Sequence, residues 1–311
     1  MWKADTRASV DQFNQWFTQF APKAYRETRK QTIEDVKRGL IHTEDLTTIT
    51  AAVIGENPGI LPMLRMSTCP PLARDRLIGL ANSSKNFVGG MEKGKIPPKL
   101  ASQLAQDYLD KICSVLARML DQDIFPWLAE KRRPSNQERY RSSTIVADRL
   151  CGAIAEPIVR NAQEKRQLVL IEQYLTSRGY QLKPHPLTAK ITEMQPGTFS
   201  FRQNVLVNSA NRNGKAIRIP IDTVIQLKSA KLPQLPILIE AKSAGDFTNT
   251  NKRRKEEATK MNQLKGTFGN QVVFVLFLCG YFDAGYLGYE AAEGIDWVWE
   301  HRTSDLDQLG I

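Results

Sequence analysis

The clearest pattern in the chain is an alternation of apolar and polar positions in its second half. Residues 198–207 and 215–227 alternate with a period of two and flank the turn-like segment NSANRNG, which predicts an antiparallel hairpin. A third apolar run ends at Lys242, and a fourth, at 270–279, is apolar enough to be buried on both faces. A helical segment at 249–269 separates these two runs. A crossover of that length predicts that the two strands run parallel.

The first half of the chain has helical periodicity instead. Phe13, Phe17 and Phe20 recur at helical spacing behind Ser9, and Gln12 completes a capping box with that serine. This pattern predicts a helix that begins at Ser9. Further helices are predicted at 25–40, 99–129 and 155–180.

The last of these helices has clear end signals. Pro157 suits its first turn and Gly179 suits its C-terminal stop. Before it, the basic segment EKRRPSNQERYRSS at 130–143 is typical of a boundary. We therefore expect a mainly helical region over 1–143 and a second domain over 144–311. The order of elements in that domain predicts an α/β (α+β) fold, with a central mixed sheet flanked by helices.

Composition adds a partner and excludes several classes. Lys and Arg exceed Asp and Glu by 43 to 33, which gives a net charge of +10 and favours a polyanionic partner such as DNA. The four cysteines are widely spaced, which argues against a structural zinc site or a disulfide framework. No apolar run approaches the roughly 20 residues that span a bilayer, and MWKADTRASV lacks a signal-peptide core. We therefore expect a cytoplasmic protein with no membrane partner.

Side-chain parity in the predicted strands indicates where chemistry lies. Glu240 and Lys242 share a face of the third strand with Leu238, because alternate residues point the same way. In the preceding strand Asp222 points away from an apolar face formed by odd-numbered positions. If the strands are neighbours, Asp222 meets Glu240 and Lys242. The odd-numbered apolar positions are Ile217, Ile219, Ile221, Ile225 and Leu227.

A fourth acid extends the apolar stripe of the helix before these strands. Glu164 precedes Leu168, Ile171 and Leu175 at spacings of four, three and four residues. A carboxylate on an inward-facing stripe needs a partner or a cation, because an unpaired buried charge is costly. Two simpler readings stay open: Glu164 is ion-paired on the helix surface, and the Glu240–Lys242 pair marks a strand that runs out into solvent.

The three strand residues together suit a magnesium site. Mg²⁺ prefers carboxylate and carbonyl oxygens and keeps several waters. Bound there, it could polarise a phosphodiester, while Lys242 orients the attacking water or stabilises charge in the transition state.

The segments PID at 220–222 and EAK at 240–242, in this order of elements, resemble the PD-(D/E)xK nuclease superfamily. The first acid departs from the family pattern, since Ile221 separates it from the proline. A closer resemblance, to the XamI-type restriction endonucleases, covers most of the chain. The segments that carry it lie at 58–81, 155–168 and 197–207.

This resemblance implies a Type II restriction endonuclease that cuts double-stranded DNA at a short palindrome with Mg²⁺ and leaves 5′-phosphate ends. It implies that Asp222, Glu240 and the Ala241 carbonyl hold one or two ions, that Lys242 is catalytic, and that Glu164 is an added helix acid. A palindromic target further implies a homodimer. A restriction–modification system implies a cognate DNA methyltransferase as functional partner, in a bacterial cytoplasm.

Several cationic and amide side chains could contact the DNA. Arginines of 1–143 could read bases, the cations after the third strand could bind phosphates, and polar residues beside Glu164 could do either. The region 1–143 would then serve DNA recognition, dimerisation or both. The candidates are Arg139, Arg141, Arg160, Gln163, Lys252, Arg253 and Arg254.

Two alternatives to a restriction endonuclease remain at this point. One is a repair or junction-cleaving nuclease with the same site. The other is a DNA-binding protein without catalysis, in which substitution of Asp222 or Lys242 would leave function intact.

Overall fold

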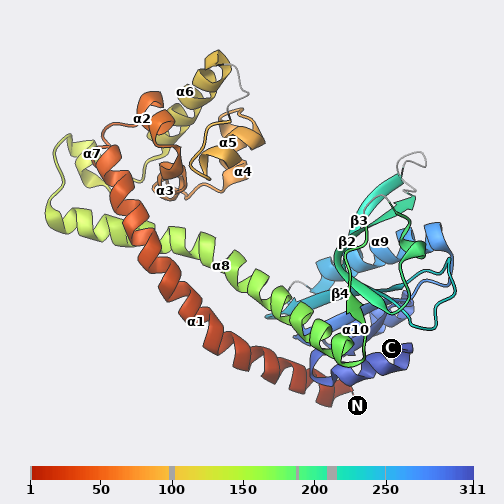
Figure 1. The fold of residues 1–311 in the computed structure, drawn as a ribbon. Helices are drawn as coiled ribbons and strands as arrows, with labels where there is room; N and C mark the ends of the chain where they lie inside the picture. The colour runs from red at the N-terminus through yellow and green to blue at the C-terminus, as the bar shows by residue number, and fades with distance from the viewer. Residues whose placement is uncertain (1, 98–101, 187–188, 209–215, 249) are drawn as a thin grey trace. The chain divides into compact units, whose positions relative to one another are not determined.

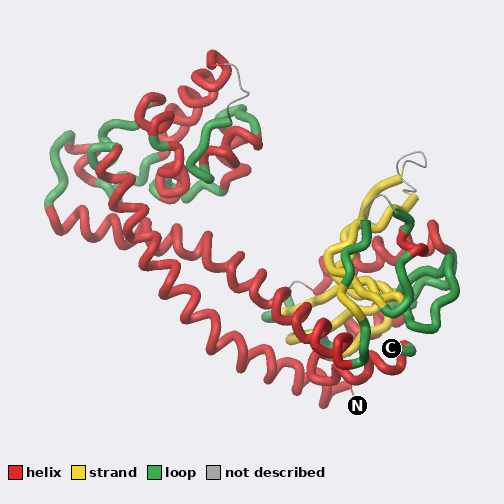
Figure 2. The backbone as a smooth tube through the Cα atoms, in the orientation of Figure 1, coloured by secondary structure: helices red, strands yellow, loops and turns green. Residues whose placement is uncertain are grey.

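The computed structural model divides the chain into two compact units, each with its own core (Figure 1). One, here the sheet unit, comprises Met1–Phe20 and Arg160–Ile311; the other, the helical unit, comprises Ala21–Val159. The described residues are 2–97, 102–186, 189–208, 216–248 and 250–311. Within them every strand of the sheet belongs to the sheet unit (Figure 2).

Two long helices contribute to both units. Helix α1 spans Trp2–His42 and helix α8 spans Asn136–Ser177. The predicted domain boundary at residue 143 lies within α8, and the units divide later in the same helix, between Val159 and Arg160.

Two predicted helix starts are wrong. Ser9 lies inside α1, where its hydroxyl accepts a hydrogen bond from the Gly280 N–H (2.8 Å), and Pro157 lies inside α8. Local capping signals cannot register such a partner, 271 residues away in the chain. The predicted stop is confirmed, because Gly179 follows α8 with φ +76°.

The helical unit is built from short helices around one apolar core. Phe87, Phe125 and Trp127 are among its fully buried side chains. Its elements between α1 and α8 are α2 (Ala51–Glu56), η1 (Pro58–Ile60), α3 (Leu61–Met66), α4 (Arg74–Leu80), α5 (Lys85–Met91), α6 (Ser102–Met119) and α7 (Pro126–Glu130).

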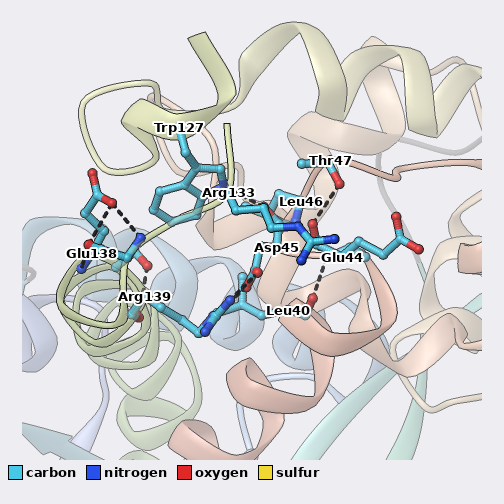
Figure 3. A network of polar contacts seen from close by, with 12 residues as sticks. Leu40, Glu44, Asp45, Leu46, Thr47, Trp127, Arg133, Glu138 and Arg139 are labelled. Carbon is cyan, nitrogen blue, oxygen red and sulfur yellow. Dashed lines mark hydrogen bonds and ion pairs between the residues drawn. The ribbon is translucent and has the colours of Figure 1, made fainter. Parts of the chain in front are cut away.

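A left-handed turn ends α1 in this unit. Glu44, Asp45 and Leu46 have φ of 49°, 57° and 69°, a conformation that costs a non-glycine residue roughly 1–2 kcal/mol. Asp45 holds the turn in place (Figure 3). Its carboxylate accepts two hydrogen bonds from Arg139 (2.9 and 2.6 Å), and its carbonyl accepts one from the Trp127 indole (2.8 Å).

The sheet unit is a six-stranded mixed sheet in the order β1-β2-β3-β4-β5-β6. The β2–β3 and β3–β4 pairs are antiparallel, and β4–β5 and β5–β6 are parallel. The predicted hairpin, the parallel third and fourth strands and the α+β fold class are thus confirmed. The strands are β1 (Gln181–Leu182), β2 (Thr198–Asn208), β3 (Ala216–Gln226), β4 (Ile237–Ala244), β5 (Phe274–Gly280) and β6 (Asp296–Trp299).

Helices cover both faces of the sheet. Helices α9 (Thr250–Phe268) and α10 (Ala284–Ala292) pack in one apolar cluster with Leu238 of β4. The C-terminal part of α8 and the 3-10 segment η3 (Glu300–Leu309) pack in a second cluster with Ile239. Alternate residues of β4 therefore face two different layers, as strand parity requires.

The predicted single apolar face of β3 is wrong. Ile219 and Ile221 belong to the cluster under α9, whereas Ile225 belongs to the cluster under α8. The change falls at Asp222, whose place in the hairpin register is opposite Arg202. Arg202 of β2 has φ +51°, outside the strand region, so the regular backbone of the hairpin is interrupted at this point.

Gly280, at the end of β5, offers a test of this architecture. It has φ +104°, and a Cβ there would lie 2.1 Å from the Ala244 carbonyl oxygen. We expect Gly280→Ala to lower the free energy of unfolding by about 3 kcal/mol, from backbone strain and overpacking together. Gly288→Ala is the control, because a Cβ there meets nothing within 4 Å. Urea unfolding measures both, and equal midpoints would contradict the assignment of strain to Gly280.

Candidate active site

The site begins where β3 and β4 separate. Their pairing ends at Thr223 opposite Ile239, one residue short of Asp222. Beyond this point the Asp222 side chain replaces the backbone of β3 as the partner of β4. Its Oδ2 accepts a hydrogen bond from the Ala241 N–H (2.9 Å). The N–H and C=O of one residue in a ladder point to the same side. The Ala241 carbonyl therefore also faces the side on which β3 has left β4.

Glu240 lies beside this opening and is 5% exposed. Its Oε1 is 3.1 Å from the Lys242 Nζ and 2.5 Å from the Lys260 Nζ of α9. Lys260 also donates to the Pro220 carbonyl of β3 (3.0 Å). Oε2 of Glu240 is buried and has no hydrogen-bond partner among the described residues. Within the described ranges, one carboxylate oxygen thus contacts two cations and the other has no hydrogen-bond partner.

The charges in the site shift one another. Burial, and then the neighbouring Glu240 carboxylate, raise the pKa of Asp222 to about 6, although the Ala241 N–H and Lys242 oppose this. Burial lowers the pKa of Lys242, but the carboxylates of Glu240 and Glu257 outweigh burial and raise it overall. Asp222, Glu240 and Lys242 therefore interact as one group, so the structure brings together the three strand residues that the sequence places in one site.

Glu164 lies at the edge of this group. Its charge contributes to the raised pKa of Asp222, while its Oε1 binds the Arg202 guanidinium at 3.0 Å. The stripe that it extends is buried as predicted, since Ile171 and Leu175 have no exposed surface. The structure thus gives Glu164 an ion-pair partner and also places it within electrostatic reach of Asp222.

The candidate DNA-binding residues are in different surroundings. Arg160 and Arg141 are exposed, Gln163 is buried, and Arg139 is bound by Asp45. Arg254 stacks over the Tyr289 ring at 5.0 Å. Arg139 and Arg141 belong to the helical unit, and the other candidates belong to the sheet unit. The side chains of Lys252 and Arg253 lie outside the described part of the structure.

Two charged residues of α9 are absent from the predicted site. Glu257 is fully buried with its Oε1 3.6 Å from the Lys242 Nζ, and Lys260 contacts Glu240. Glu257, Met261 and Leu264 follow one another at spacings of four and three residues, which is the same signal that marks Glu164. The many charges of α9 hide this stripe.

The site fits a hard divalent cation. Asp222 and Glu240 provide carboxylates, and the Ala241 carbonyl faces the opening. The buried Glu240 Oε2 has no hydrogen-bond partner among the side chains and backbone that the structure describes. Across the described residues no group of three or more His, Cys, Asp and Glu side chains is arranged to hold a metal. Mg²⁺ does not require such a group, because it is commonly held by one or two carboxylates and completes its shell with water and substrate oxygens.

Comparison with known proteins identifies the family. The model of the XamI restriction endonuclease family matches residues 44–299. Over 309 residues the chain is 54% identical to the Type II restriction enzyme SalI of Streptomyces albus G, covering 99% of this chain and 97% of that enzyme. The chain therefore belongs to the XamI restriction endonuclease family, as the sequence resemblance predicts. The predicted class of enzyme, a Type II site-specific deoxyribonuclease, is confirmed with it.

One solved structure has a weaker likeness. Protein VC1899 from Vibrio cholerae matches 91% of this chain and 55% of its own, with 11% identity and a TM-score of 0.28, which is too slight to indicate a shared fold. Of the helices in the described ranges, none has the length and apolar character needed to cross a membrane.

Proposed function

We propose that the chain cuts both strands of DNA at a short palindromic site, with Mg²⁺, and leaves 5′-phosphate ends. The observation that carries this proposal is the buried Glu240 carboxylate near Asp222: two lysines hold one of its oxygens, and the other has no hydrogen-bond partner in the described part of the chain. A membership in the restriction endonuclease family makes DNA the substrate that fits this site. The excess of 10 positive charges suits the same polyanion.

Asp222, Glu240 and the Ala241 carbonyl are the residues that would hold the ion. When bound, Mg²⁺ supplies charge neutralisation at the phosphate and acidifies a water molecule. The number of ions per site is one or two. These ligands come from the point where β3 leaves β4, so the sheet itself positions them.

The Lys242 ammonium acts on the reacting atoms. It donates a hydrogen bond to the attacking water or to a non-bridging phosphate oxygen, and so stabilises negative charge that grows in the transition state. Water adds to phosphorus and loses a proton, while the bond from phosphorus to the 3′ oxygen breaks. The 3′ oxygen leaves with a proton, which gives a 3′-hydroxyl and a 5′-phosphate. Glu164 approaches this centre from α8 and is the added helix acid.

The remaining candidates are assigned to DNA contacts. Arg160 and Gln163 lie four residues and one residue before Glu164 on α8, so they are suited to the DNA near the scissile bond. Lys252, Arg253 and Arg254 begin α9 and are suited to phosphates. Arg141 is exposed and suited to reading a base, whereas Arg139 must first leave Asp45 or keep its structural role.

A palindromic site implies a two-fold homodimer, in which each chain cuts one strand. A bacterial cytoplasm and a cognate methyltransferase that protects host DNA complete the proposal.

A digest of plasmid DNA of known sequence tests the function directly. With Mg²⁺ we expect a few discrete fragments whose ends map to one palindrome and carry 5′-phosphates, and with EDTA we expect intact plasmid. A smear, or cuts only at branched DNA, would favour another nuclease activity. Sedimentation of the enzyme measures the dimer, and DNA methylated within the mapped site should resist cleavage.

A further inference from the structure

A second pair of carboxylates lies behind Lys242. Glu257 of α9 and Glu290 of α10 both have no exposed surface. Oε1 of Glu257 is 3.6 Å from the Lys242 Nζ, and its Oε2 accepts a hydrogen bond from the Tyr286 hydroxyl (2.6 Å). Lys242 thus has two carboxylate neighbours, one from its own strand and one from the covering helix.

The two buried glutamates differ in their donors. Tyr286 has one phenolic proton, and Glu257 receives it. Both oxygens of Glu290 are buried, and its carboxyl lies close to the Glu257 carboxylate and to the Tyr286 hydroxyl. Burial, and then the Glu257 charge, raise the pKa of Glu290 to about 8. Two buried carboxylates side by side share a proton, because the second charge is too costly.

Glu257 has a further consequence for Lys242 during the reaction. The Glu240 carboxylate forms ion pairs with Lys242 and Lys260, and in the proposed function it also binds the cation. An ion at Glu240 weakens the hold of that carboxylate on Lys242. Glu257 is fully buried on α9, the helix that covers this strand, and it is not among the proposed ligands of the ion.

We propose that Glu257 is the positioning residue of Lys242, and that it keeps its negative charge because Glu290 carries the proton of the buried pair. This inference rests on the proposed function for the role of Lys242. In this proposal Glu257 has a negative charge and Glu290 a proton, although both are fully buried. The same Glu→Gln substitution should therefore slow cleavage at Glu257 and have little effect at Glu290.

Isosteric glutamine variants test this in the full-length enzyme. Glu257→Gln removes the charge that faces Lys242, and we expect single-turnover cleavage in Mg²⁺ to fall by about 10- to 100-fold, the range found for partners that orient the ligands of a metal site. Glu290→Gln imitates a protonated acid, and we expect cleavage within about threefold of wild type. Glu257→Asp keeps the charge and should recover part of the rate. Glu256→Gln, on the exposed side of the same helix, controls for lost charge.

A double-mutant cycle separates the positioning role of Glu257 from the catalytic role of Lys242, on which it rests. If Glu257 acts through Lys242, Glu257→Gln has little further effect in a Lys242→Ala background. Wild-type cleavage by Glu257→Gln beside a defective Lys242→Ala would overturn the positioning role alone. Normal cleavage by Lys242→Ala would overturn the site assignment and the positioning role with it. DNA binding in EDTA should not weaken in Glu257→Gln, which excludes simple misfolding.

Stability against pH tests the proton assignment without any cleavage. Glu290 faces Glu257 and Arg254 of α9 and Tyr286 of its own helix, with Lys242 of β4 beyond Glu257. The folded state keeps the Glu290 proton up to about pH 8, whereas the unfolded chain releases it near the usual value of 4.5. The folded state thus binds more protons in this window, so stability falls as pH rises.

We expect the urea midpoint of the wild type to fall between pH 5 and pH 8, and to fall less in Glu290→Gln. If the urea midpoint fell equally with pH in the wild type and in Glu290→Gln, and fell less in Glu257→Gln, the proton would lie on Glu257. That result would overturn the inference.

Discussion

Glu240→Gln should lose Mg²⁺-dependent cleavage by on the order of 10³-fold or more, because it removes a ligand and the charge that attracts the ion. The loss should persist at high Mg²⁺ concentration. Single-turnover cleavage of a DNA fragment with the mapped site measures it. A near-normal rate at saturating Mg²⁺ would show that Glu240 does not hold the ion.

Glu240→Gln should also change the stability of the protein and its affinity for DNA. Lys242 and Lys260 lose the carboxylate between them, which should cost about 2 kcal/mol of unfolding free energy. This is less than the roughly 3–5 kcal/mol lost when a fully buried ion pair is broken, since both lysines retain some contact with solvent. DNA binding in EDTA should tighten, because the site becomes more positive. Glu256→Gln is the matched control, as it removes an exposed charge nearby.

Lys242→Ala should fail at a different step. We expect kcat to fall by on the order of 10²–10³-fold, the range seen when one donor to a developing negative charge is removed. The Mg²⁺ concentration that gives half-maximal cleavage should stay close to that of the wild type, since Asp222 and Glu240 remain. Steady-state and single-turnover kinetics over a range of Mg²⁺ concentrations measure both quantities.

Lys255→Met is the control for Lys242→Ala. Lys255 is an exposed cation of α9, and its loss should weaken DNA binding in a salt-dependent way without changing kcat. A Lys242→Ala enzyme with wild-type kcat and only a raised KM would assign Lys242 to phosphate binding.

The core of the site could be predicted because strand parity is a local rule. Glu240 and Lys242 are two residues apart in one strand, so they share a face whatever the rest of the sheet does. Asp222 meets them for a different reason than parity alone. The strand it belongs to changes face beside Arg202, and the side chain reaches the backbone of Ala241.

The errors have a common physical cause. Ser9 and Pro157 carry local signals for helix starts, yet both lie within helices of 41 and 42 residues, α1 and α8. Ser9 bonds to Gly280, a partner that helical periodicity cannot reveal. Lys260 is hidden for a similar reason. Its position on a highly charged helix resembles a solvated face, and only the packing of α9 over the sheet brings it to Glu240.

The hydrogen bond from the Ala241 N–H to Asp222 gives the enzyme a built-in reporter. In most of a sheet an amide is protected from exchange with solvent deuterium by the backbone of the next strand, but here a side chain does this. A ligand that draws the carboxylate away releases this amide, and one that fixes the carboxylate protects it further. Exchange at this single amide would therefore follow occupancy of the site before any bond in DNA is cut.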